Sequence, residues 1–282
     1  SYIKHQFSPS YIDLIRDYED SFTDTTMTFS DTQTPDEAYI YVEDNYIIND
    51  RLSSNLGLHY SFYHENLKAY NSIQPRISFR YLLDENISLK FSYASMQQNI
   101  HLLTNSSYGL PNDIWVPATR FVPPQRSQQF VFGCNKYFNE NAYEASIELY
   151  YKKMEGLVTY AEGSNILGTD FSSWEDRVEV NGIGRSYGLE LFVKKNKGKL
   201  TGWVGYTLSR SMRKFKNINL GREYPYKFDR PHDLSIVSKY KLNESTTFSL
   251  TWVYGSGNSI TLPLEQYILV SGNNIQEYYE YG

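Results

Sequence analysis

Apolar and polar side chains alternate in run after run of this chain, and that period of two limits what the chain can fold into. The segment 143–151 reads YEASIELYY, and 248–254 reads FSLTWVY. Successive side chains of a β-strand point to opposite faces, so each run predicts a strand with one apolar and one mostly polar face. About ten such runs occur with no helical segment between them. The chain is therefore predicted to be all-β, a large antiparallel meander.

The expected strands are joined by connections that alternate between short and long. Short turns such as Asn49-Asp50-Arg51 and Asn196-Lys197-Gly198 contain residues that tolerate the backbone of tight hairpins. The long connections are 8–37, 98–125, 158–183, 214–227 and 257–282, and 65–71 is a shorter exception. Sorting of short turns and long loops onto opposite ends is typical of outer-membrane barrels. The ten strands are expected at 38–49, 52–64, 72–83, 87–97, 126–138, 143–157, 184–196, 199–213, 228–242 and 245–256.

The polar face carries ionised groups, which inverts the arrangement of a soluble barrel. We therefore expect a transmembrane β-barrel whose apolar face meets lipid and whose polar face meets water. Ten residues at roughly 3.4 Å each, tilted by about 40°, rise on the order of 25 Å, enough for an outer membrane. The positions expected to face the lumen or a plug are Arg76, Arg80, Glu144, Glu148, Glu190 and Lys194. Those expected to face lipid are Leu56, Leu58, Tyr60, Ile77, Phe79, Leu89, Phe91, Ile147, Leu149, Leu250 and Trp252.

Composition agrees with a membrane interface and gives no support to several other classes. Tyrosine occurs 27 times, and tyrosine and tryptophan favour the boundary between lipid and water. The sequence contains no run of about 18 apolar residues, so it predicts no transmembrane helix. The net charge of −5, with mixed signs, gives no support for a nucleic-acid partner. The single cysteine, Cys134, alternates with Phe130 and Phe132 and is expected to face lipid.

Six segments resemble the C-terminal part of the barrel of TonB-dependent outer-membrane receptors, particularly the Bacteroidetes type with a carboxypeptidase-regulatory-like domain and a plug. The segments appear in the family's order and cover most of 38–263. They are QPRISFRY (74–81), LPNDIWVP (110–117), SYGLEL (186–191), GKLTGWVGYTLSRS (198–211), FDRPHDLSIV (228–237) and WVYGSGNSITLP (252–263).

The resemblance implies a 22-stranded type of barrel in the bacterial outer membrane that imports a scarce nutrient with energy from TonB. Residues 1–282 would be a partial barrel domain, lacking the plug and the TonB box, with both ends in extracellular loops and strands 38–49 and 245–256 as edges. The implied partners are the rest of the barrel, the plug, TonB through the missing plug segment, the lipid bilayer and a surface lipoprotein. No cofactor is implied.

Candidate chemistry is sparse. Asp229, Arg230, His232 and Asp233 could form a catalytic or metal pair, but a salt bridge at the start of a strand is the favoured interpretation. The five histidines are scattered, and metal binding needs three or four convergent ligands. The run GIGRSYG (182–188) has no following helix or Lys-Ser/Thr pair, so its glycines are expected to permit a bend or bulge. We expect no catalytic residue, no metal and no enzyme.

Three aromatic residues in long loops are the candidates for ligand contact: Tyr108, Trp115 and Trp174. Packing of the loops against one another is the alternative for the same rings. Four readings of the whole chain remain open: an active transporter, a passive porin, an outer-membrane barrel enzyme such as a protease or lipase, and a soluble adhesin or lectin sheet. The loop sorting and the quoted segments favour the transporter. The ligand is left open among iron chelates, cobalamin, glycans and peptides.

Overall fold

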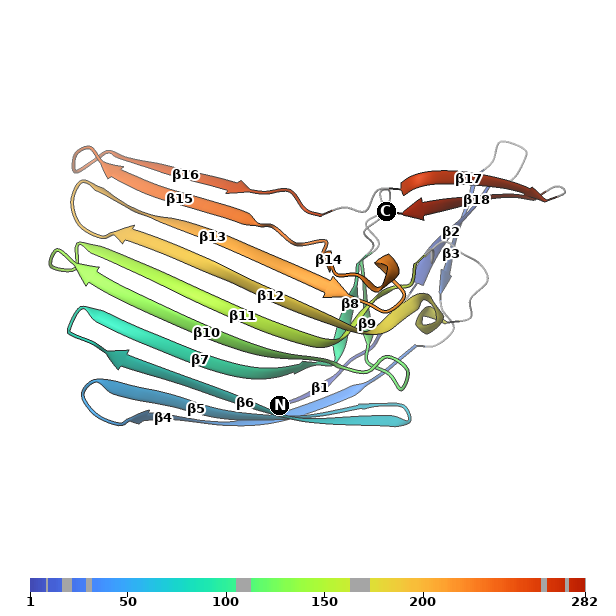
Figure 1. Cartoon of the computed structure of the whole chain (residues 1–282), viewed down its shortest axis with the longest axis horizontal. Helices are drawn as coiled ribbons and strands as arrows, with labels where there is room; N and C mark the ends of the chain where they lie inside the picture. The colour runs from blue at the N-terminus through green and yellow to red at the C-terminus, as the bar shows by residue number, and fades with distance from the viewer. Residues whose placement is uncertain are drawn as a thin grey trace.

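The chain folds into one large antiparallel sheet, as a computed structural model shows (Figure 1). The structure describes residues 1–8, 32–104, 113–162 and 173–259, together with the backbone of 10–16, 22–28, 263–271 and 274–281. The sheet has twelve strands in the order β1-β4-β5-β6-β7-β10-β11-β12-β13-β15-β16, with β14 paired to β13. Each long strand therefore pairs with its neighbours in sequence, which confirms the predicted meander.

The long strands agree with the predicted ranges to within four residues, except that the strand expected at 184–196 begins six residues earlier, at Val178. Antiparallel hairpins β2–β3, β8–β9 and β17–β18 pair within the segments expected to be long loops. The strands of the large sheet are β1 (Tyr2–Lys4), β4 (Asp36–Ile47), β5 (Leu52–Glu65), β6 (Lys68–Leu82), β7 (Ile87–Gln98), β10 (Gln125–Phe138), β11 (Tyr143–Tyr160), β12 (Val178–Lys195), β13 (Leu200–Lys214), β14 (Tyr224–Pro225), β15 (His232–Lys241) and β16 (Thr247–Gly255). The hairpins are formed by β2 (Ser10–Arg16), β3 (Phe22–Thr28), β8 (Ile100–Leu103), β9 (Ile114–Pro117), β17 (Pro263–Ser271) and β18 (Asn274–Tyr281), and two short 3-10 helices are η1 (Trp174–Arg177) and η2 (Asn219–Gly221).

The short turns gather at one end of the sheet and the long connections at the other (Figure 1). We call these the turn end and the loop end. Side-chain amides and carboxylates close the turns: Asn49 Oδ1 accepts from the backbone N–H of Arg51 and Leu52, each at 2.9 Å. The Asp84 carboxylate caps the next turn in the same way. Asparagine and aspartate favour such turns because their side chains bond the backbone two or three residues on.

One predicted connection was wrong. The segment 65–71 was expected to be a loop, but β5 and β6 continue through it and leave only Asn66 and Leu67 as a two-residue turn. Asn66 has a positive φ of 44°, which asparagine tolerates better than most residues. This tight hairpin lies at the loop end, so the sorting of connection lengths has one exception.

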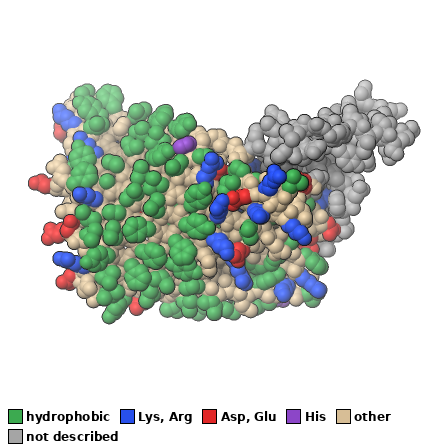
Figure 2. All heavy atoms as spheres, viewed as in Figure 1, with side chains coloured by type: hydrophobic (Ala, Val, Ile, Leu, Met, Phe, Trp, Pro, Cys, Tyr) green, Lys and Arg blue, Asp and Glu red, His purple; other side chains and the backbone are tan. Residues whose placement is uncertain are grey.

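The apolar face of the sheet is exposed over its whole width. Leu58, Leu149 and Leu250 are 52%, 52% and 60% exposed. Strand register makes the apolar positions continuous, because Phe79 pairs with Phe91, which pairs with Phe132 on the next strand. Figure 2 shows this surface as a broad apolar band with charged side chains towards both ends. Every position predicted to face lipid, and Cys134 with them, lies on this face by register.

Buried apolar side chains lie instead mainly among the connections and strand ends at the loop end. The core of the described residues is formed by Leu103, Val116, Val122, Val158 and Trp174. A protein in water rarely leaves its largest apolar surface uncovered. The sheet therefore needs a second apolar phase against its outer face, which a lipid bilayer supplies. No helix among the described residues is long and apolar enough to cross a membrane.

The face assignment predicts a sharp difference between two arginine substitutions at similar depth. Leu149→Arg places a charge in the apolar band and should lower the free energy of unfolding by about 2–4 kcal/mol. Ser78→Arg, on the polar face one row away, should change it by less than about 1 kcal/mol. Urea unfolding of the complete barrel in lipid vesicles measures both values. Equal losses for the two variants would contradict the assignment.

Candidate functional site

The polar face of the sheet carries the charged positions singled out from the sequence. Arg80 pairs with Lys90, which pairs with Gly133, and Gly133 pairs with Glu148, so these residues share one face. Glu148 continues the row to Glu190 on β12. Register places Arg76, Glu144 and Lys194 on the same face. That these six side chains meet a plug or lumenal water in a complete barrel stays a prediction.

Glycines on the polar face make room for large neighbours. A Cβ on Gly188 would lie 2.7 Å from the Tyr150 ring, and one on Gly182 would lie 2.3 Å from the Phe215 ring. The run 182–188 was expected to form a bend or bulge, and an irregularity lies at its start, where the register shifts on both sides of the Leu157–Gly182 pair. Gly156 of β11 lies at one of these shifts with a φ of +69°, and Asn181 of β12 lies at the other with a φ of 59°. The close approach of the Tyr150 and Phe215 rings leaves no room for a side chain at positions 188 and 182.

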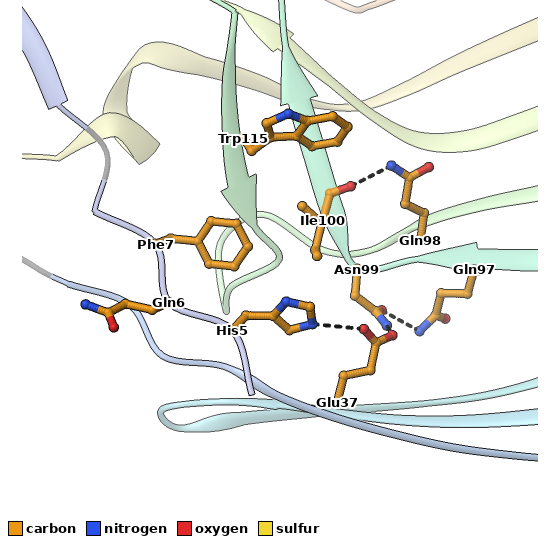
Figure 3. Close-up of a pocket in the computed structure, with 9 residues that line it drawn as sticks. All are labelled: His5, Gln6, Phe7, Glu37, Gln97, Gln98, Asn99, Ile100 and Trp115. Carbon is orange, nitrogen blue, oxygen red and sulfur yellow. Dashed lines mark hydrogen bonds and ion pairs between the residues drawn. The ribbon is translucent and has the colours of Figure 1, made fainter. Parts of the chain in front are cut away.

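A pocket opens at the loop end, between the N-terminal residues and the start of the 99–124 connection (Figure 3). Its volume is about 730 Å³. Polar side chains from β4 and the end of β7 meet aromatic rings from the N-terminal segment and β9 there. The lining residues are His5, Gln6, Phe7, Glu37, Gln97, Gln98, Asn99, Ile100 and Trp115. The pocket thus combines rings with hydrogen-bonding groups, the usual composition of a small-molecule site.

Glu37 is the centre of the polar side of this pocket. Its carboxylate accepts a hydrogen bond from Asn99 Nδ2 at 2.8 Å and lies 3.3 Å from His5 Nε2. Asn99 Oδ1 in turn accepts from Gln97 Nε2 at 3.0 Å. Figure 3 shows this chain of contacts running along one wall, with Trp115 and Phe7 on the other side of the opening. A carboxylate held by two donors is a fixed acceptor for a further donor group.

The pocket forms where two neighbouring strands separate. β6 and β7 pair from Arg76 to Leu82 and no further towards the loop end, although both strands continue. Pro75 lies at this point, and proline has no N–H to donate to a ladder. Gln74 fills the gap, because its side chain accepts from the Gln97 backbone N–H at 3.2 Å and donates to Ser61 Oγ at 3.0 Å. Sequence reasoning named Trp115 of this pocket but missed its polar wall, although Pro75 within a strand was an available signal.

The three predicted loop aromatics have different surroundings. Trp115 is 56% exposed and lines the pocket. Trp174 is only 4% exposed, packs in the loop core and donates its indole N–H to Gln33 Oε1 at 3.2 Å. Tyr108 lies outside the described residues. The burial of Trp174 corresponds to the loop-packing alternative, whereas Trp115 is placed where a ligand could reach it.

Hydrogen bonds fix the 99–124 connection to the barrel wall. The buried Tyr63 hydroxyl donates to the Ala118 carbonyl at 3.0 Å, and the Tyr70 hydroxyl donates to the Thr119 carbonyl at 2.7 Å. The Thr119 hydroxyl bonds Glu175 of η1, which joins this connection to the next one. The wall of the pocket that carries Trp115 is thereby anchored at its C-terminal end.

The Asp229 segment has the structural role expected of it. Asp229 is 2% exposed, accepts from Arg210 Nη1 at 3.0 Å and from the Ser211 backbone N–H at 2.6 Å. His232 Nδ1 lies 2.8 Å from the Tyr206 hydroxyl. These bonds fix the start of β15 against β13. The described residues contain no group of three or more side chains placed to hold a metal ion.

His101 is fully buried beside the pocket wall, where Gln125 Nε2 donates to its Nδ1 at 2.9 Å. Burial lowers the pKa of His101 to about 4, from about 6.5 in an open chain. Between about pH 6.5 and about pH 4, the His101 imidazole takes up a proton only when the 99–124 connection opens and exposes it to water. The stability of this connection is therefore complete above about pH 6.5 and declines below it.

We predict that the 99–124 connection loses about 2 kcal/mol of local stability between pH 7 and pH 5. Hydrogen exchange of residues 100–103 and 114–122, corrected for intrinsic rates, measures the loss. His101→Leu cannot titrate and should remove most of the pH dependence. A His101 imidazole that titrates near 6.5 in the folded barrel, by NMR, would contradict the prediction.

Comparisons with known proteins agree on the fold. A family model described as TonB dependent receptor-like, beta-barrel, matches residues 4–279. Among curated proteins, none matches the sequence. The siderophore receptor PiuA from Acinetobacter baumannii is 14% identical, with a TM-score of 0.62 and coverage of 90% of this chain and 42% of that one.

Two further solved structures are similar at the same low identity. FpvA of P. aeruginosa, bound to a heterologous pyoverdine, has a TM-score of 0.61 at 12% identity, covering 99% of this chain and 37% of that one. The alcaligin outer-membrane receptor FauA from Bordetella pertussis has a TM-score of 0.55 at 14% identity, covering 80% and 38%. The chain thus spans about two fifths of the length of these structures, and at such identities the likeness concerns the fold alone.

Proposed function

Because this chain belongs to the family of TonB-dependent receptor-like β-barrels, we propose that it forms part of the wall of a receptor that imports a scarce nutrient by energy-coupled transport. The family is one of outer-membrane receptors, and the apolar band fits that membrane. One observation carries the proposal. The family model matches residues 4–279, and the strand register of the same residues separates the two kinds of side chain. Apolar side chains that suit lipid lie on one face, and the charged positions within the strands lie on the other.

The sheet is completed by further strands in this proposal. Within the described residues, β16 has no partner on its outer side, and β1 covers only Asp36–Ala38 of β4. Lipid offers no hydrogen bonds, so each unpaired backbone group there costs several kcal/mol. Closing strands from the same polypeptide or a partner would remove that cost. Residues 1–282 are then a partial barrel domain, and the six charged positions of the polar face meet a plug or lumenal water.

The quoted segments support a more specific placement among Bacteroidetes receptors with a carboxypeptidase-regulatory-like domain and a plug. In such a receptor the plug segment would engage TonB, and a surface lipoprotein would be a further partner. The neighbours PiuA, FauA and FpvA are siderophore or pyoverdine receptors by name. Ferric siderophores are therefore the first ligands to test, followed by cobalamin, glycans and peptides.

Loss of TonB separates this proposal from its rivals. Cells carrying the complete receptor should take up the ligand at nanomolar concentration, and deletion of TonB should abolish that uptake while leaving surface binding intact. Uptake that is independent of TonB and proportional to concentration would favour a passive porin. Chemical turnover of the ligand at the cell surface would favour a barrel enzyme.

Trp115 is the loop aromatic proposed to contact the ligand. Trp115→Ala should weaken ligand binding to the complete receptor by about tenfold, the typical effect of removing a stacked ring of about 1.4 kcal/mol. Phe121→Ala is the matched control, because Phe121 is a comparably exposed loop ring, at 66%, that does not line the pocket. Titration with labelled ligand measures both. Unchanged affinity for Trp115→Ala would remove this residue from the site.

A further inference from the structure

A row of aromatic rings marks the border of the apolar band on its loop-end side. Tyr93, Phe130, Tyr151 and Tyr187 are register partners in succession across β7, β10, β11 and β12. The rings of Tyr93 and Phe130 pack with their centroids 5.0 Å apart. Tyrosine favours the membrane–water interface because its ring is apolar and its hydroxyl polar. This aromatic row therefore locates the interface on the loop-end side.

Basic side chains follow directly beyond the aromatic row. Arg210 pairs with Tyr187 at the end of the row, and Lys153 pairs with Arg185 one row further out. Another row out, Arg126 pairs with Glu155, and Lys214 pairs with Ile183. Figure 2 shows Lys and Arg side chains gathered along this border of the apolar band. We call Arg126, Lys153, Arg185, Arg210 and Lys214 the basic belt.

The belt places like charges opposite each other. Lys153 and Arg185 are direct cross-strand partners, and such like-charge pairs destabilise a sheet. Each already has one exposed carboxylate, Glu155 at 2.6 Å and Glu223 at 2.6 Å. Both side chains nevertheless remain about half exposed, at 55% and 49%, and the guanidinium keeps further donors for an anion. Asp229 pairs with Arg210 at 3.0 Å and compensates its charge, so the excess positive charge of the belt comes from its other members.

We infer that the basic belt binds the phosphate of an anionic lipid headgroup in the outer leaflet. The argument is one of position as well as charge. A ligand that contacts the belt and the aromatic row together must be amphiphilic. The surface on the turn-end side of the row is formed by Phe132, Leu149 and Leu189, which are all apolar. A phosphorylated lipid places its phosphate on the belt and its acyl chains on that surface. A free phosphate would contact the basic belt alone and leave the apolar surface uncovered. The inference rests on the membrane placement of the proposed function and is independent of transport.

The test uses the complete barrel that contains this chain, freed of lipid in detergent. A glycolipid with two phosphates (lipid A) is titrated and its binding measured by native mass spectrometry. Arg126→Gln, Lys153→Gln and Arg185→Gln combined should weaken binding at least about tenfold, given how strongly each basic residue near a surface attracts anionic lipid. Glu155→Gln combined with Glu223→Gln removes the competing carboxylates and should tighten binding. Arg210 is left intact because it holds Asp229.

Two controls make the test specific. Lys136→Gln removes a charge from the same outer face of β10 at the turn end, and it should leave binding unchanged. The dephosphorylated glycolipid should bind the wild-type barrel weakly, with the same affinity that the diphosphorylated lipid has for the triple variant. Inorganic phosphate should compete only weakly with the diphosphorylated lipid. Unchanged binding in the triple variant, or an equal loss in Lys136→Gln, would overturn the inference. Competition by inorganic phosphate at the affinity of the lipid would also overturn it. Uptake by a TonB-competent cell tests the proposed function separately.

Discussion

The continuous backbone ladder between neighbouring strands is the interaction on which the rest of this structure depends. From β4 to β16 each long strand pairs in antiparallel register with the next, so a side chain's parity fixes its face on every strand. A slip by one residue would exchange the two faces of a strand completely. The apolar band, the charged polar face, the aromatic row and the basic belt are all consequences of this one register. Lipid strengthens the constraint, because it leaves no alternative partner for the backbone.

The loop end adds a second layer of organisation that the ladder alone does not give. The connections there pack around Leu103, Val116 and Trp174, and the hydroxyls of Tyr63 and Tyr70 attach them to the wall. Beside this core, the separation of β6 and β7 leaves room for Gln74, whose amide oxygen accepts from the Gln97 N–H of β7 and whose amide nitrogen donates to Ser61 of β5. The pocket around Glu37 and Trp115 is therefore held by the core and by the strand register together.

Much of the fold could be predicted from the sequence because its signal is local. Period-two alternation and turn residues such as Asn49 and Asp84 located ten strands and their pairing. The turn at Asn66 was missed because the polar segment around it resembles a loop until the pairing is known. The irregularity at the start of the run 182–188 was expected from its glycines, but their close neighbours Tyr150 and Phe215 were not, because these rings come from other segments. The Glu37 pocket joins residues far apart in sequence through long-range contacts, and alternation says nothing of those.

Spin labels placed one at a time along β11 in a bilayer test the central claim most directly. Labels at positions 145, 147, 149 and 151 should be accessible to dissolved oxygen, which concentrates in lipid, and protected from a water-soluble nickel complex. Labels at 144, 146, 148 and 150 should show the reverse, with a strict period of two. Accessibility without alternation, or alternation in the opposite phase, would contradict an apolar face in lipid and a polar face turned inward.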